Sequence, residues 1–248
     1  MFYLNNNELT HDNNRYHGKN NPLPLFFLLF LKAERVYHVF MNYILLVYLA
    51  VTVIHVSVRD MKKERLSQIT KVMLMPILLW YYLSMQNQSG ILPVLVSMAL
   101  VMGTLGDFLL LFPDKPVMFG LGAGAFLVGH IFYISYFAHF LSSPGLMLVV
   151  LLVAIYPLVL VYKMLRPSPL HIPMFVYALV LVCVGIFAAG AGNIVSLIGV
   201  LFFISSDGML GYNSMNKKFS NVPIMLTYTL AQLLLIIGIL AGQGALTL

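Results

Sequence analysis

Charged residues are scarce in this 248-residue sequence: Asp, Glu, Lys and Arg make up 9% of it, whereas 60% is hydrophobic. The mean hydropathy is +0.92. A soluble domain normally has roughly a quarter of its residues charged. So few charges cannot cover a protein surface in water, and lipid must therefore be the solvent for most of the chain. The length suits one helical bundle and leaves no room for a second folded domain.

Several residue patterns that carry chemistry are missing. The single cysteine, Cys183, lies within an apolar run, which excludes a disulfide within the chain and argues against a zinc cluster. The sequence also has no serine in a nucleophile elbow, no HExxH pair and no glycine-rich phosphate loop. We therefore predict no metal site and no cofactor, and any catalysis would have to rest on carboxylates.

What the sequence does contain is a series of eight apolar runs, each bounded by charge, Pro, Gly or Asn. A membrane span needs about 20 predominantly apolar residues. Residues 36–245 are therefore predicted to form an all-α polytopic bundle of about eight transmembrane helices, and residues 1–35 a polar, disordered extension with a short apolar segment. Met41 is an alternative start. The predicted spans are Val36–Val56, Ile69–Met85, Ile91–Phe112, Val117–Leu141, Leu146–Tyr162, Ile172–Ala191, Ile194–Tyr212 and Val222–Ala241.

The basic residues, which give a net charge of +6, alternate between the predicted loops. The first, third, fifth and seventh loops carry Lys or Arg, whereas the even loops and the C-terminus carry none. Under the positive-inside rule the odd loops are cytoplasmic and both termini lie on the other side. Basic residues in the N-terminal extension oppose this assignment for the N-terminus. The distribution argues against nucleic-acid binding and for a multi-pass protein, of the inner membrane if the source is bacterial.

Only two of the eight acidic residues, Asp107 and Asp207, fall inside predicted spans. An ionised Asp at the bilayer centre costs about 2.5–3.5 kcal/mol, so such a residue normally faces the bundle interior. Their flanks, Thr104–Leu110 and Ile204–Leu210, are similar, and each Asp precedes the predicted end of its span by five residues. Two parallel four-helix repeats would bring both carboxylates to one depth near a common axis. Two separate aspartates in small polar pockets are the alternative.

Other polar residues in the spans are candidates for binding a substrate beside this pair. They are His130, Tyr133, Tyr228, Gln232 and Lys71. His130 shares a helix face with Phe126 and Tyr133, as Tyr228 does with Gln232, because residues three or four apart are neighbours on a helix. Interhelical hydrogen bonding is the alternative role for His130 and Gln232. For Lys71 the alternative is a side chain that reaches the membrane interface.

Four short motifs, in this order on the eight spans, resemble those of one family. They are Gly106-Asp107, Phe126-x-x-Gly129-His130-x-x-Tyr133, Gly199-x-x-Phe202-x-x-Ser205-Ser206-Asp207 and Tyr228-x-x-x-Gln232. Over about residues 40–245 the sequence therefore resembles the YhhN-like lysoplasmalogenase family, the transmembrane alkenylglycerophospholipid hydrolases. That family often has Lys-Pro at the start of the second span, whereas Val72 follows Lys71 here.

The resemblance implies hydrolysis of the vinyl ether bond of lysoplasmalogen, which gives a fatty aldehyde and glycerophosphocholine or glycerophosphoethanolamine. The implied partners are a lysophospholipid substrate and membrane lipid, without a cofactor. Vinyl ethers are hydrolysed by protonation of the β-carbon and attack of water on the resulting oxocarbenium ion. Two close carboxylates in a medium of low dielectric constant cannot both ionise easily, so one can supply the proton while the other stabilises the cation and activates water. The sequence does not determine which aspartate plays which part.

Two other functions stay open on the residues alone. Paired intramembrane aspartates in a parallel repeat are also what a proton-coupled transporter uses. A non-catalytic membrane scaffold would explain the bundle but would leave Asp107 and Asp207 without a role. The family resemblance favours the hydrolase.

Overall fold

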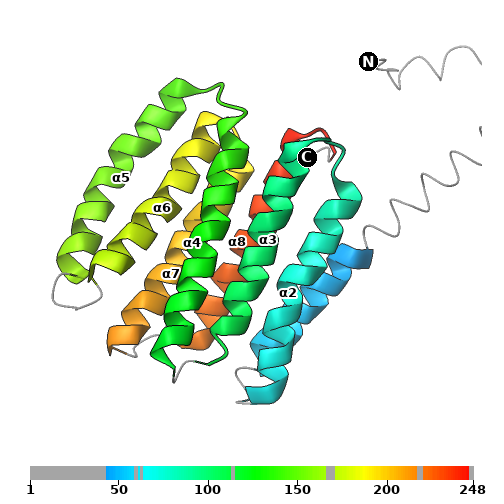
Figure 1. Cartoon of the computed structure of the whole chain (residues 1–248), viewed down its shortest axis with the longest axis vertical. Coiled ribbons are helices and arrows are strands. Elements are labelled where there is room, and N and C mark those ends of the chain that lie inside the picture. Colours follow the sequence, from blue (N-terminus) through cyan, green and yellow to red (C-terminus); the bar gives the residue numbers. More distant parts are fainter. Residues whose placement is uncertain are drawn as a thin grey trace, which may run out of the picture. The chain divides into compact units, whose positions relative to one another are not determined.

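The computed structural model describes residues 43–58, 61, 64–112, 115–165, 171–216 and 220–245, all within one compact unit, Met41–Leu248. These residues form eight helices and no strand. A helix at Tyr43–Val58 is followed by α2 (Glu64–Met85), α3 (Ile91–Leu109), α4 (Pro116–Ala138), α5 (Pro144–Leu165), α6 (His171–Gly190), α7 (Ile194–Asn216) and α8 (Asn221–Gly242). Figure 1 shows them as antiparallel neighbours along the chain. The predicted extension, residues 1–35, lies outside the described ranges.

The predicted class of fold is confirmed. The seven helices α2 to α8 are each long and apolar enough to cross a membrane. The helix Tyr43–Val58, which overlaps the first predicted span (Val36–Val56), is shorter, and the residues before Tyr43 lie outside the described ranges. The protein is therefore a multi-pass integral membrane protein built as a helical bundle.

The ends of two helices differ from the prediction. α3 ends at Leu109, two residues after Asp107, whereas α7 continues to Asn216, nine residues after Asp207. Pro113 follows α3 in the sequence and favours an early end, whereas α7 has no such residue and extends through a polar last turn. The inference that both aspartates lie equally far from their helix ends was wrong, so their proximity has to rest on their contacts.

The helix pairs recur with an offset of four helices. α2 packs on α3 as α6 packs on α7, α3 packs on α4 as α7 packs on α8, and α2 contacts α8 as α6 contacts α4. This recurrence is what two parallel four-helix repeats require, since equivalent helices then meet equivalent partners. Of the helices α2 to α8, α5 packs against α6 and no other. It lies at one edge of the group in Figure 1.

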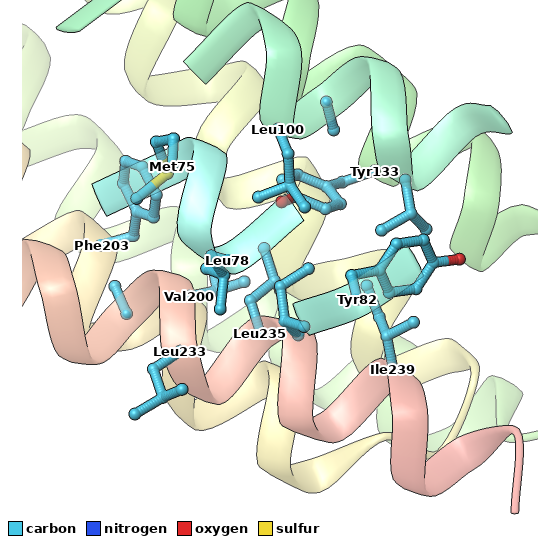
Figure 2. Packing of buried hydrophobic residues seen from close by; sticks show 14 of the residues in the cluster. Met75, Leu78, Tyr82, Leu100, Tyr133, Val200, Phe203, Leu233, Leu235 and Ile239 are labelled. Atoms are coloured by element: carbon cyan, nitrogen blue, oxygen red, sulfur yellow. The ribbon is translucent and has the colours of Figure 1, made fainter. Parts of the chain in front are cut away.

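The core lies around α8, which is the most buried of the spans, whereas the span of α5 has no buried residue. Figure 2 shows part of this core, in which Leu78 of α2, Val200 of α7 and Leu235 of α8 are completely or almost completely buried. The outward faces carry large apolar side chains, as on α5, and these contact lipid in a bilayer. The polar residues enclosed by the bundle are therefore shielded from both water and lipid.

Glycine lets two helix pairs approach closely. A Cβ atom on Gly199 of α7 would lie 2.9 Å from the carbonyl oxygen of Ala231 in α8, and one on Gly129 of α4 would lie 3.1 Å from that of Ala99 in α3. Any other residue would separate the backbones. These glycines belong to the recognised motifs, and small residues at helix contacts are the usual basis of close packing in membranes.

The orientation of the bundle can be tested because the described basic residues gather at one end. Arg65 is the second residue of α2, Lys115 precedes α4 and Lys163 lies in the last turn of α5, and these helix ends lie on the same side in Figure 1. Reporter fusions in the α3–α4 and α7–α8 loops are expected to report a cytoplasmic location, and a fusion after α8 the opposite side. A cytoplasmic C-terminus would contradict this orientation.

Candidate functional site

Asp107 lies at the meeting point of three helices, where its carboxylate is 1% exposed. From α2, Nζ of Lys71 approaches Oδ1 to 3.3 Å and forms an ion pair. From α8, the hydroxyl of Tyr228 donates a hydrogen bond of 2.7 Å to Oδ2. Both predicted neighbours therefore contact Asp107, and the buried carboxylate has a cation and a phenol as partners.

Asp207 on α7 has a different environment. Its Oδ2 accepts a hydrogen bond of 2.5 Å from the hydroxyl of Tyr177 on α6. Among the described residues no lysine or arginine lies within ion-pair distance of this carboxylate. Asp207 is thus held by a neutral donor, whereas Asp107 is held by a cation and a neutral donor.

The two aspartates occupy equivalent places in the two halves of the bundle. Lys71 of α2 reaches Asp107 on α3, and Tyr177 of α6 reaches Asp207 on α7. In each half, the helix that precedes the aspartate-bearing helix in the chain supplies a side-chain donor to the carboxylate. The repeat therefore fixes two similar positions, and the residue at the donor position makes them chemically unequal.

Aromatic rings connect the two carboxylates. The ring of His130 on α4 lies 5.7 Å from that of Tyr177 and 4.9 Å from that of Phe203, and Phe203 lies 5.6 Å from Tyr228. All three contacts are edge to face, the favoured arrangement of aromatic pairs. A chain of side chains in contact therefore links Asp107, through Tyr228, Phe203, His130 and Tyr177, to Asp207.

The Gly106-Asp107 motif fits this site through Phe126. A Cβ atom on Gly106 would lie 2.7 Å from Cε2 of Phe126, so no side chain larger than hydrogen can occupy this position without moving that ring. Phe126 in turn lies edge-on to Tyr228, with the ring centroids 6.2 Å apart. Gly106 thus lets the aromatic neighbours of Tyr228 pack closely beside Asp107.

Tyr133 and Gln232, also predicted as site residues, do not hydrogen-bond to either carboxylate. They line a small cavity of about 10 Å³ between α3, α4, α7 and α8, together with Phe126, His130, Phe203 and three small residues. Phe126 and Phe203 separate this cavity from Tyr228. The predicted set therefore divides into residues on the carboxylates and residues around an adjacent cavity.

Three site residues were not recognised in the sequence. Tyr177 contacts Asp207, Phe203 contacts both His130 and Tyr228, and the buried Tyr48 donates to the carbonyl oxygen of Thr229, next to Tyr228. Phe203 lies four residues before Asp207 and could have been found from helical spacing. In the described part of the chain no three His, Cys, Asp or Glu side chains are grouped so as to hold a metal ion.

The fold and the site together define a polytopic helical membrane protein with two aspartates in its spans, of which Asp107 is buried and Asp207 is partly buried. Residues 66–239 match the model of the YhhN family, and the chain therefore belongs to the YhhN family, which confirms the resemblance found in the sequence. The chain is also similar to lysoplasmalogenase TMEM86B of Mus musculus, with 31% identity over 157 residues. That match covers 62% of this chain and 66% of the mouse protein, slightly less than two thirds of its length. No solved structure matches the chain.

Proposed function

We propose that this protein is a membrane-embedded hydrolase that cleaves the vinyl ether bond of lysoplasmalogen. The products would be a fatty aldehyde and glycerophosphocholine or glycerophosphoethanolamine. Family membership and the similarity to the mouse lysoplasmalogenase TMEM86B support the substrate class. The observation that carries the proposal is the pair of intramembrane carboxylates with unequal partners, because this reaction needs one acid and one anion.

Asp207 is proposed as the general acid and Asp107 as the ionised partner. The ammonium group of Lys71 favours the negative form of Asp107. With that charge nearby, a second negative charge on Asp207 is disfavoured, because its partner Tyr177 is neutral. Asp207 can then give its proton to the β-carbon, while Asp107 stabilises the oxocarbenium ion and accepts a proton from the attacking water.

The fatty chain is proposed to lie along the apolar outer surface of the bundle, with the vinyl ether reaching inward between the two carboxylates. The phosphate would then lie at the basic end, where Lys115 is exposed just before α4. Lys217 and Lys218, the other candidates for this contact, lie outside the described residues. A single-chain lipid suits this arrangement because it can enter sideways from the bilayer.

Release of free aldehyde from lysoplasmalogen by the purified protein in detergent tests this proposal. A hydrolase needs no membrane gradient and releases aldehyde under these conditions. A proton-coupled transporter releases none, and shows substrate-dependent proton movement only after reconstitution into vesicles. If no aldehyde is released and such proton movement is observed, the protein is a transporter and not a hydrolase.

Lys71→Met is expected to lower turnover by about tenfold or more, because it removes the cation that keeps Asp107 ionised and leaves a buried acid without its partner. Lys71→Arg keeps the charge and is expected to retain more activity. Lys163→Met, which removes an exposed lysine at the end of α5, is the control and should behave as the wild type. Equal rates for Lys71→Met and the control would contradict the assignment of Asp107 as the ionised partner.

A further inference from the structure

The cavity beside the carboxylates is small and has an unusual lining. It is lined by Ala99 and Gly103 of α3, by Phe203 of α7, and by residues of α4 and α8. Its free volume of about 10 Å³ is close to what a single water molecule needs, and far too small for any part of a lipid chain. An apolar cavity of this size would stay dry, so the polarity of its walls decides what it can hold.

Two polar atoms of the cavity wall have no hydrogen-bonding partner among the described residues, the hydroxyl oxygen of Tyr133 and Oε1 of Gln232. His130 lies beside them in the same wall and interacts with the backbone of Phe126. Tyr133 and Gln232 are 2% and 3% exposed, so bulk water does not reach them. A buried polar group left without a partner costs about 1–3 kcal/mol, and two of them around one cavity indicate a missing common partner.

We propose that this cavity binds one water molecule, held by Tyr133 and Gln232 beside His130, and that this water is the one consumed in the hydrolysis. The tyrosine hydroxyl can both donate and accept, whereas an amide oxygen accepts, so a water molecule can satisfy both groups. Buried waters typically make two to four such hydrogen bonds. The inference rests on the proposed function, because it gives that reaction its second reactant.

The position of the cavity suits delivery of this water to the reacting carbon. Phe126 and Phe203 form its wall toward Tyr228, which donates to Asp107. A water that passes between these rings reaches the carboxylate proposed as the base. When the apolar alkenyl chain is bound, it excludes bulk water from the site. A water molecule that is already bound can attack after protonation without the site having to open again.

The chemical step balances with this water. After Asp207 has given its proton to the β-carbon, the water oxygen forms a bond to the cationic carbon and loses one proton to Asp107. The hemiacetal then breaks its bond to the glycerol oxygen, which takes the hemiacetal hydroxyl proton and leaves as an alcohol. A proton passed from Asp107 back to Asp207 restores the starting state.

Kinetics in D₂O separate this role from a merely structural one. In the wild type, protonation of carbon is expected to limit turnover and to give a solvent deuterium isotope effect on kcat above unity. Gln232→Leu and Tyr133→Phe are expected to lower kcat about tenfold or more, as loss of a buried hydrogen bond does. They should also reduce the isotope effect, because capture by water then becomes limiting.

Matched controls lie on α4 and at the residue directly after α8. Tyr136→Phe and Gln243→Leu remove a buried tyrosine hydroxyl and a glutamine amide that contact each other outside the cavity, and should keep the wild-type isotope effect. Cavity variants that are slow but retain that isotope effect, or that turn over at the wild-type rate, would overturn the proposal.

A high-resolution structure adds a test that needs no activity: density for a water contacting Tyr133 and Gln232 supports the site. A dry cavity in an enzyme that still releases aldehyde would refute the water site and leave the proposed function intact.

Discussion

An alkenyl lysophospholipid is expected to be hydrolysed at a rate at least about 10²-fold above its saturated alkyl or acyl analogue, the least that a positioned general acid contributes. Only the alkenyl ether has an electron-rich β-carbon that can accept a proton. A saturated ether of the same shape offers no such carbon, although it fits the same apolar surface. The acyl analogue would need attack at a carbonyl, and the described part of the site offers neither an activated nucleophile nor an oxyanion hole.

The comparison is made with three lipids of equal chain length and one head group, and products are quantified by mass spectrometry. The saturated ether serves as a competitive inhibitor, which shows that it binds although it does not react. Inhibition without turnover is the expected behaviour. Turnover of the acyl lipid at a rate comparable to that of the alkenyl lipid would place the protein in another reaction class.

Asp107→Asn and Asp207→Asn are each expected to lower turnover by about 10²- to 10⁴-fold or more, the contribution of a positioned acid or base. Asn keeps the shape of Asp but neither supplies a catalytic proton nor carries a negative charge. The double variant should be little worse than either single variant, because residues that act as one unit are not additive. Strictly additive losses would show that the two carboxylates act separately.

Smaller changes at the same site refine this result. Tyr177→Phe and Tyr228→Phe remove only the hydroxyl that donates to Asp207 or to Asp107. Each is expected to slow the reaction less than loss of the carboxylate, since the reacting group stays in place. Glu at either position is expected to be poor as well, because one more methylene moves the carboxyl away from the β-carbon.

Much of this arrangement could be predicted from the sequence, for identifiable reasons. A charge in an apolar span is rare and costly, so Asp107 and Asp207 stand out without a structure. Lys71 also stands out as a charged residue in an apolar span, and in the structure it contacts Asp107. Helical spacing placed His130 and Tyr133 on one face, and both line the cavity.

Other parts could not be predicted. Tyr177 is one of 14 tyrosines, and its partner Asp207 lies 30 residues away on the next helix, so nothing local distinguishes it. The end of α7 was misplaced because polar residues can continue a helix beyond the membrane. The cavity depends on how side chains of four helices fill space, which no spacing rule gives.

The central claim, that two intramembrane carboxylates carry out the hydrolysis, is tested most directly by aldehyde release from lysoplasmalogen by the purified Asp207→Asn protein. Ser206→Ala, which removes the adjacent hydrogen bond to the carbonyl oxygen of Ile224 but no carboxylate, is measured beside it. Both proteins should show cooperative thermal unfolding in detergent. Aldehyde release should persist in Ser206→Ala and be lost in Asp207→Asn. A folded Asp207→Asn protein that releases aldehyde at a rate near that of the wild type would contradict the two-carboxylate mechanism.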